Sequence, residues 1–265
     1  MTDSWDDGEP EAPKPGPGRQ PVVHARTGQN ERVTTHSIIW DMGGTLIDTY
    51  PSVDRTLAAV AARHGHALAA ATVARMTRRA IASAIDELSE RYAIPHEELD
   101  AAYADLKRSW ADAPPPVMAG ARDVIDHVRR IGGLNLVVTN RDRTSAAALL
   151  TATGLAMDDL VCPGDGFPRK PDPAMYRAVL ERNHLDPVDC LAVGDRAIDA
   201  LASEQVGIRC VILETPGIPV AGDGERITDL RRLIDRLAPS PGPVTSWSGP
   251  ATSRSSPERS QQPST

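Results

Sequence analysis

Short apolar runs alternate with stretches of helical period along much of the chain. The first run, residues 37–40, is apolar without polar alternation, which predicts a buried strand. Later runs of the same kind predict further strands at 134–138, 160–161, 190–193 and 208–213. Helical patterns separate these later runs. This alternation predicts an α/β fold, a doubly wound, mainly parallel sheet with helices on both faces.

The helices between these strands have recognisable ends. Glycines stop two of them at Gly132 and Gly154, and Pro173 opens another with Asp172 as its N-cap. The predicted helices of this part span residues 121–131, 144–153, from 173 onward, 197–205 and 227–237.

Residues 51–116 follow a purely helical pattern. Leu57 and Val60 share one face of a first helix, a long helical segment covers 73–88, and another covers 96–110. Three prolines at 114–116 then break the pattern. We therefore expect a helical cap at 51–116, inserted into an α/β core made of residues 34–50 and 117–238.

Composition limits the remaining possibilities. Residues 1–33 and 239–265 are rich in Pro, Gly and Ser or acidic residues and are expected to be disordered tails. The net charge of -7 disfavours a nucleic-acid or membrane-surface partner. No apolar run approaches the roughly 20 residues of a membrane span, and no signal peptide is expected. Three cysteines are expected to be reduced core residues in a cytoplasmic protein.

Three polar motifs follow apolar runs. Residues 41–46 read Asp-Met-Gly-Gly-Thr-Leu, Lys170 begins a Lys-Pro-Asp-Pro segment, and Gly-Asp at 194–195 is followed by Asp199. Ligands of doubly wound sheets bind at the carboxyl ends of the strands. We therefore expect Asp41, Thr139 and Asp195 to gather at that edge, with Lys170 arriving from a loop. Carboxylates and a lysine in one place suit Mg²⁺-assisted phosphoryl transfer.

Together these motifs resemble the haloacid dehalogenase-like (HAD) hydrolase superfamily. The family motifs are Asp-x-Asp-Gly-Thr-Leu, a Thr or Ser at a strand end, a lysine, and Gly-Asp-x-x-x-Asp. Their counterparts begin at Asp41, Thr139, Lys170 and Gly194. The resemblance covers about residues 36–237. It is closest to the subgroup with a small helical cap, like phosphoglycolate phosphatases, and it implies a Rossmann-like core.

The resemblance also implies a mechanism. Asp41 would attack phosphorus and form an aspartyl phosphate. Mg²⁺ would bind Asp41, the backbone carbonyl of Gly43 and Asp195, while Thr139 and Lys170 would hold the phosphoryl oxygens.

Three further residues support this predicted site. Asp199 would orient Lys170 or a metal-bound water. Asn140 and Arg141 directly follow Thr139 and are predicted to face the substrate, although Arg141 could equally be a solvated charge at a strand end.

The chain departs from the family pattern at Gly43, where the family aspartate protonates the leaving oxygen and later activates water. General acid–base help of this kind contributes roughly 10²–10⁴-fold. Three interpretations remain. The substrate has a good leaving group, or another group such as Asp48 or the substrate supplies the proton, or the protein is a catalytically weakened phosphate-binding regulatory or interaction module.

We favour a Mg²⁺-dependent phosphatase of a small phosphorylated metabolite. A dehalogenase would use Asp41 against carbon and would not need the metal carboxylates. The sequence identifies neither the substrate nor the oligomeric state.

Overall fold

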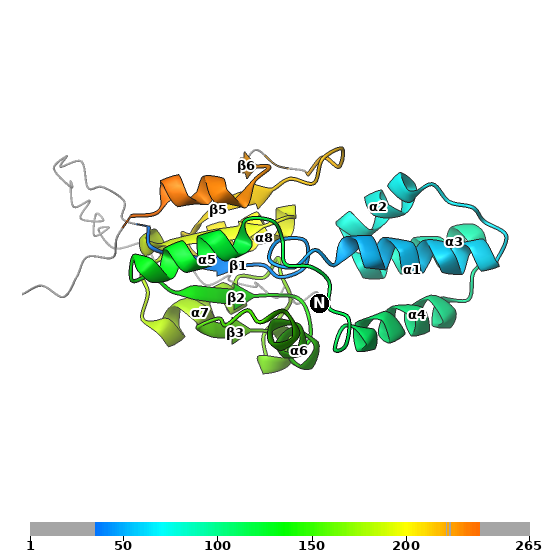
Figure 1. Cartoon of the computed structure of the whole chain (residues 1–265), viewed down its shortest axis with the longest axis horizontal. Helices are drawn as coiled ribbons and strands as arrows, with labels where there is room; N and C mark the ends of the chain where they lie inside the picture. The colour runs from blue at the N-terminus through cyan, green and yellow to red at the C-terminus, as the bar shows by residue number, and fades with distance from the viewer. Residues whose placement is uncertain (1–34, 221, 223, 239–265) are drawn as a thin grey trace, which may run out of the picture. The chain divides into compact units, whose positions relative to one another are not determined.

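A six-stranded parallel sheet organises the chain (Figure 1). The structure is a computed structural model, and it describes residues 35–220, 222 and 224–238. The strands are β1 (Ser37–Trp40), β2 (Asn135–Val138), β3 (Asp159–Val161), β4 (Cys190–Gly194), β5 (Arg209–Leu213) and β6 (Glu225–Ile227). Their order is β3-β2-β1-β4-β5-β6. The five strands predicted from the sequence are confirmed as β1–β5, each within one residue of its predicted ends.

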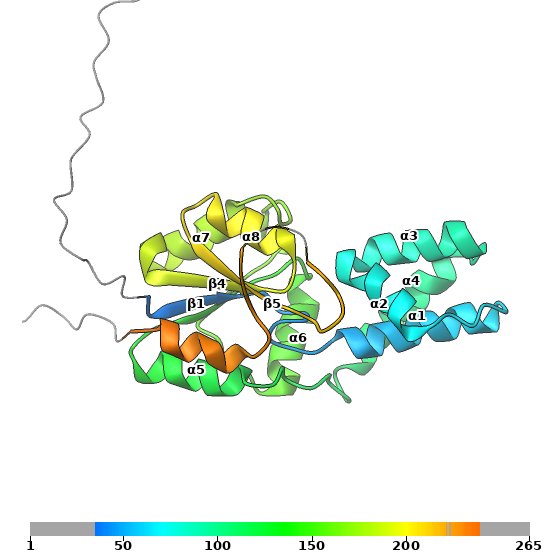
Figure 2. The same ribbon diagram turned by 90° about the horizontal axis from the view of Figure 1, so that it is seen from above.

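Helices cover both faces of this sheet, as the fold prediction required (Figure 2). Ile38 and Trp40 of β1 belong to one apolar cluster with Val124. Ile39, between them, belongs to a second cluster with Val179. Successive side chains of a strand point to opposite faces, so one buried strand serves both clusters. The first face carries α5 (Ala121–Arg130), α6 (Arg143–Thr153) and the 3₁₀ helix η3 (Leu230–Arg236), and the second carries α7 (Ala174–Asn183) and α8 (Ala197–Glu204).

Four further helices lie between β1 and α5 in the chain. They are α1 (Tyr50–Arg63), α2 (Ala70–Arg79), α3 (Ile81–Tyr92) and α4 (His96–Ser109). They pack on one another through buried side chains such as Leu57, Leu88 and Leu99. Ile47 and Val117 form an antiparallel bridge, so the segments that lead into and out of this helical group run side by side.

The long helical segment predicted at 73–88 is wrong in one respect. It is two helices, because Ala80 has φ −169° and ψ 140°, an extended conformation that interrupts the helical hydrogen bonds. Val73 and Met76 are buried before the break, and Ala84 and Leu88 after it. The apolar residues have helical spacing on both sides of the break, so the sequence pattern looks like that of one continuous helix.

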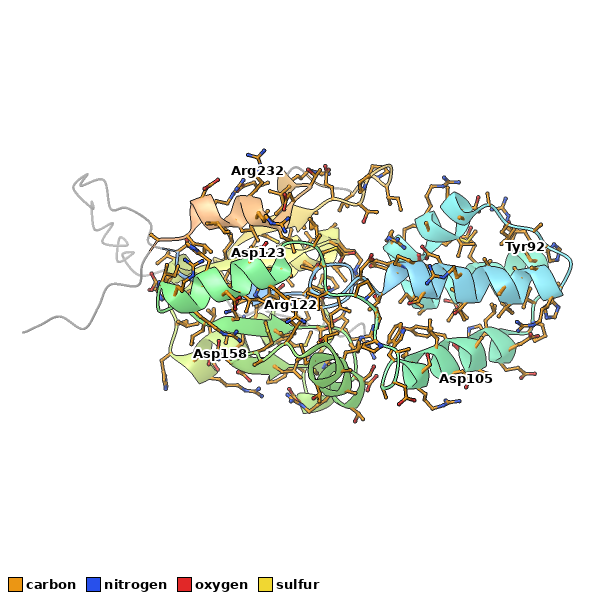
Figure 3. All side chains as sticks on the ribbon, in the orientation of Figure 1. Tyr92, Asp105, Arg122, Asp123, Asp158 and Arg232 are labelled. Atoms are coloured by element: carbon orange, nitrogen blue, oxygen red, sulfur yellow. The ribbon has the colours of Figure 1, made fainter. Side chains whose placement is uncertain are left out.

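The predicted last helix at 227–237 is also wrong at its start. Ile227 ends β6, which pairs with β5 in parallel, Ile227 lying opposite Leu213. The helical turns begin only after Asp229, whose carboxylate accepts a hydrogen bond from the Arg231 amide (2.9 Å). The resulting η3 lies against α5, and Figure 3 labels Arg232 on η3 and Asp123 on α5.

The two ends of the described region meet. The amide of Ala238 donates to the carbonyl of Thr35 (2.8 Å). The predicted tails, 1–33 and 239–265, lie outside the described residues. Within the described part of the chain, no helix is long and apolar enough to cross a membrane. Two short 3₁₀ helices complete the element list, η1 (Pro163–Asp165) and η2 (Pro187–Asp189).

Candidate active site

Two aspartates lie at the centre of one edge of the sheet. Asp41 directly follows β1 and Asp195 directly follows β4, and these strands are hydrogen-bonded neighbours with Trp40 opposite Val193. The amide of Asp41 donates to the carbonyl of Val193 (2.8 Å). Strand order reverses between β1 and β4, which is where open α/β sheets bind their ligands.

Lys170 joins the carboxylates of this edge. Its Nζ donates to Oδ1 of Asp41 (2.6 Å), to Oδ1 of Asp199 (2.6 Å) and to the carbonyl of Val138 (2.9 Å). These three bonds use all three protons of the ammonium group. Lys170 therefore fixes the Asp41 carboxylate in one orientation, and Asp199 in turn fixes Lys170.

Burial makes the charges of this cluster interact strongly. The side chains of Lys170 and Asp199 are fully buried. Burial opposes the charge of Lys170, but Asp199 and Asp41 outweigh it and raise the pKa of the ammonium group above 10.5. The lysine therefore stays charged at neutral pH.

Asp195 has the least compensated carboxylate of the cluster. Burial, together with repulsion from Asp41 and Asp199, raises the pKa of Asp195 from 3.8 to about 8. Its Oδ1 is buried and accepts no hydrogen bond from the residues that the structure describes. The nearest cationic atom is Nε of Arg196 at 3.9 Å.

The close approach of β4 and α8 requires glycine at position 194. A Cβ on Gly194 would lie 2.4 Å from both Cβ and Cγ of Asp199. That distance is far inside van der Waals contact. A larger residue would displace Asp199 and, through it, Lys170.

The loop after β2 supplies Thr139 and Asn140. The Thr139 hydroxyl accepts a hydrogen bond from the amide of Arg141 (3.2 Å). Asn140 uses both ends of its side-chain amide on the backbone of Lys170, accepting from N (2.7 Å) and donating to O (3.1 Å). Asn140 therefore holds the lysine segment in place, and the predicted substrate contact of Asn140 stays a prediction.

A cavity of about 590 Å³ opens beside this cluster. Its wall combines the predicted residues Asp41, Gly43 and Thr139 with residues of the four-helix group. The helical group contributes Thr77, Ala80, Ile81, Ala82, Tyr103 and Lys107. The loops of the α/β core contribute Asn140, Arg141, Asp142, Arg169 and Arg196. Four of these residues are cationic, which suits an anionic ligand.

Comparison with known proteins agrees with this geometry. The family model described as haloacid dehalogenase-like hydrolase matches residues 35–207. The chain belongs to the haloacid dehalogenase-like hydrolases. It is 30% identical over 215 residues to phosphoglycolate phosphatase 1 of Pseudomonas aeruginosa, covering 74% of this chain and 78% of that protein.

Two other similarities are of the same kind. A plasmid-encoded phosphoglycolate phosphatase of Cupriavidus necator is 28% identical over 212 residues, covering 76% of this chain and 92% of that protein. The crystal structure of a HAD family hydrolase from Deinococcus radiodurans, with bound phosphate and sodium, has a TM-score of 0.65. That match covers 78% of this chain and all of the other at 18% identity, so it supports the HAD fold alone.

The HAD-like site has groups that fit a divalent cation. The buried Oδ1 of Asp195 lacks a hydrogen-bond donor among the described residues, and Asp195 follows β4 beside Asp41, which follows the neighbouring strand β1. Hard divalent cations such as Mg²⁺ prefer oxygen ligands. In the residues that the structure describes, no three His, Cys, Asp or Glu side chains form a complete ligand set. The predicted set needs only two, Asp41 and Asp195, since its third member is the carbonyl of Gly43.

Sequence reasoning missed two residues of this HAD-like site. Tyr50 lines the cavity, and the centroid of its ring lies 3.8 Å from the guanidinium carbon of Arg78. Thr49 is buried, and its hydroxyl faces Gly43. Both precede or begin α1, and nothing in a single sequence separates them from ordinary helix-start residues.

Proposed function

We propose that this protein is a Mg²⁺-dependent phosphatase of a small phosphorylated metabolite, with Asp41 as the nucleophile. The observation that carries the proposal is the Asp41–Lys170–Asp199 chain of hydrogen bonds at the β1–β4 edge. It presents one carboxylate in a fixed orientation at the wall of a cation-lined cavity. Family membership and the phosphoglycolate phosphatase relatives support the same reaction class.

In this proposal the reaction has two stages. An oxygen of Asp41 attacks phosphorus, the bond between phosphorus and the leaving oxygen breaks, and an aspartyl phosphate forms. Water then cleaves the aspartyl phosphate and releases inorganic phosphate. Thr139 and Lys170 hold the phosphoryl oxygens, Lys170 by exchanging one of its three hydrogen bonds for a bond to the substrate, and Asp199 keeps Lys170 in position.

Asp41, the Gly43 carbonyl and Asp195 would hold Mg²⁺. When bound, the ion offsets the repulsion between an anionic nucleophile and an anionic substrate.

The helices α1–α4 act as a cap in this proposal. Tyr103 and Lys107 of α4 line the cavity together with the strand-end residues Asp41 and Thr139. In this proposal the cap, residues 51–116, contributes to substrate selection.

The test is Asp41→Asn in the full chain. Asparagine retains an acceptor for Lys170 but is a poor nucleophile, so the melting temperature should hold. Turnover of phosphorylated metabolites with Mg²⁺ should fall by more than about 10³-fold. The variant should also lose the hydroxylamine-sensitive phosphoryl label that the wild type acquires.

Wild-type turnover in Asp41→Asn would contradict the nucleophile assignment. Wild-type inactivity towards every phosphate ester, with phosphate and Mg²⁺ still bound, would instead favour the binding-module alternative.

A further inference from the structure

The space beside Gly43 is bordered by a cation. A Cβ built on Gly43 would lie 3.1 Å from Oγ1 of Thr49 and 3.9 Å from Nη2 of Arg141. A longer side chain at position 43 would therefore extend toward the Arg141 guanidinium. Asp41, Gly43, Thr49 and Arg141 all line the same cavity, so a substrate bound at Asp41 would meet the guanidinium at that point.

Arg141 is held there from two sides. Its Nη1 donates to Oγ of Ser145 (3.1 Å) on α6, and its guanidinium carbon lies 5.0 Å from the ring centroid of Trp110. In the described part of the chain, no carboxylate forms an ion pair with Arg141. Its positive charge is therefore positioned without being neutralised.

The two nearby acids are placed differently. Asp142 lines the cavity, but its Oδ1 accepts the Ser145 amide (2.8 Å) as the N-cap of α6. Asp48, the sequence-based candidate for the missing acid, does not line the cavity. Of the two described side chains that a Cβ at position 43 would meet, Thr49 and Arg141, only Arg141 carries a charge.

We propose that Arg141 stabilises the leaving oxygen as an anion, and that the substrate is a phosphate whose leaving oxygen departs readily as an anion. Acyl, enol and aryl phosphates form this class. The inference rests on the proposed function, because it needs Asp41 to attack phosphorus.

The electron balance of the step is complete without an acid. As the bond from Asp41 to phosphorus forms, the electron pair of the breaking bond passes to the leaving oxygen. A guanidinium does not release its proton at neutral pH. It pairs with the new oxyanion, which leaves as a carboxylate, enolate or phenolate and takes any proton from bulk water.

The experiment measures kcat/KM against leaving-group pKa. The substrates are a series of substituted phenyl phosphates, acetyl phosphate and one alkyl phosphate, all with saturating Mg²⁺. Removing a preorganised oxyanion partner typically costs 10²–10³-fold. Arg141→Ala should therefore lose about 10²-fold or more on the poorest leaving groups and less than about 10-fold on acetyl phosphate. The dependence of kcat/KM on leaving-group pKa should become steeper in Arg141→Ala. Added guanidinium chloride should restore the activity of this variant on substrates with poor leaving groups.

Two variants serve as controls, and melting temperatures check the fold of each. Arg143→Ala removes a neighbouring guanidinium that instead pairs with Asp165, and it should keep the wild-type slope. Arg141→Lys keeps a charge and should fall between wild type and Arg141→Ala.

The outcomes separate the two proposals. Wild-type turnover with an unchanged slope in Arg141→Ala overturns this inference alone. A steeper slope in Asp142→Asn than in Arg141→Ala also overturns it, since the leaving group would then receive a proton from Asp142. Wild-type inactivity on the whole series, including acetyl phosphate, overturns the proposed function and this inference together.

Discussion

At the scale of single residues, the site depends on which side chain faces which. Lys170 has three hydrogen-bond partners and no spare proton, so its role toward Asp41 is fixed by geometry. Gly43 has the opposite character. Its missing side chain leaves a gap between the Thr49 hydroxyl and the Arg141 guanidinium.

Gly43→Asp should add a general acid to this gap. We expect turnover on alkyl phosphates to rise by up to about 10²-fold, the lower end for acid–base catalysis, with a smaller gain on aryl phosphates. The new Cβ would crowd Oγ1 of Thr49 at 3.1 Å, so the full gain should need Thr49→Ala as well. Thr49 makes no side-chain cap bond to α1, which makes its removal tolerable.

Steady-state rates of the two single variants and the double variant test this expectation. Thr49→Ala alone is the matched control and should leave the alkyl-to-aryl rate ratio at its wild-type value. Equal or lower activity of both variants that carry Gly43→Asp, with Mg²⁺ binding intact, would show that position 43 does not limit catalysis.

At the scale of elements, the buried strands determine the chemistry of the cysteines. Cys190 begins β4, Cys210 lies within β5, and Cys162 follows β3, and all three are free and buried. Burial raises their pKa values from 9.0 to about 12, about 12 and about 11 respectively. The prediction of core cysteines is thereby confirmed.

These thiols should resist modification in the folded protein. At pH 8 a thiol reagent should react slowly with the native chain and rapidly with all three thiols in urea. Because the folded state holds the protons more tightly, the stability contribution is complete below pH 9 and is lost as the pH rises toward 11–12.

Urea unfolding at pH 8 and pH 10 measures that loss. Cys190→Ala removes one of the thiols, so the variant should lose less stability between pH 8 and pH 10 than the wild type. Rapid labelling of a native thiol at pH 8 would contradict the prediction.

At the scale of the whole molecule, the described region closes on itself. Thr35 accepts the Ala238 amide through its carbonyl and a hydrogen bond from Nη2 of Arg209 (2.9 Å) through its hydroxyl. The first and last described residues are therefore tied to each other and to β5.

A chain shortened to residues 34–238 should therefore fold and act like the full chain. Every described hydrogen bond of the site is retained, and truncation is tolerated where no backbone bond is lost. We expect the melting temperature to change by less than about 2 °C and kcat/KM to be unchanged. A large fall in either value would mean that a terminal segment packs on the core or completes the site.

Much of the fold, together with the family motifs, could be predicted from the sequence alone. Unbroken apolar runs are dictated by burial on both faces of a parallel sheet, so β1–β5 could be predicted within a residue. The strand-end position of Asp41 and Asp195 followed from the same runs, since a residue after a strand lies at the sheet edge. These patterns involve residues that are close together in the chain, so they can be recognised in a single sequence.

Contacts between residues that are distant in the chain could be seen only in three dimensions. The break at Ala80 and strand β6 depend on packing partners, because either segment also satisfies a helical pattern by itself. Lys170 meets Asp41 across 129 positions, and Arg141 meets Trp110 of the helical insertion. These contacts depend on how strands and helices are placed in space, and residue spacing along the chain carries no record of that placement.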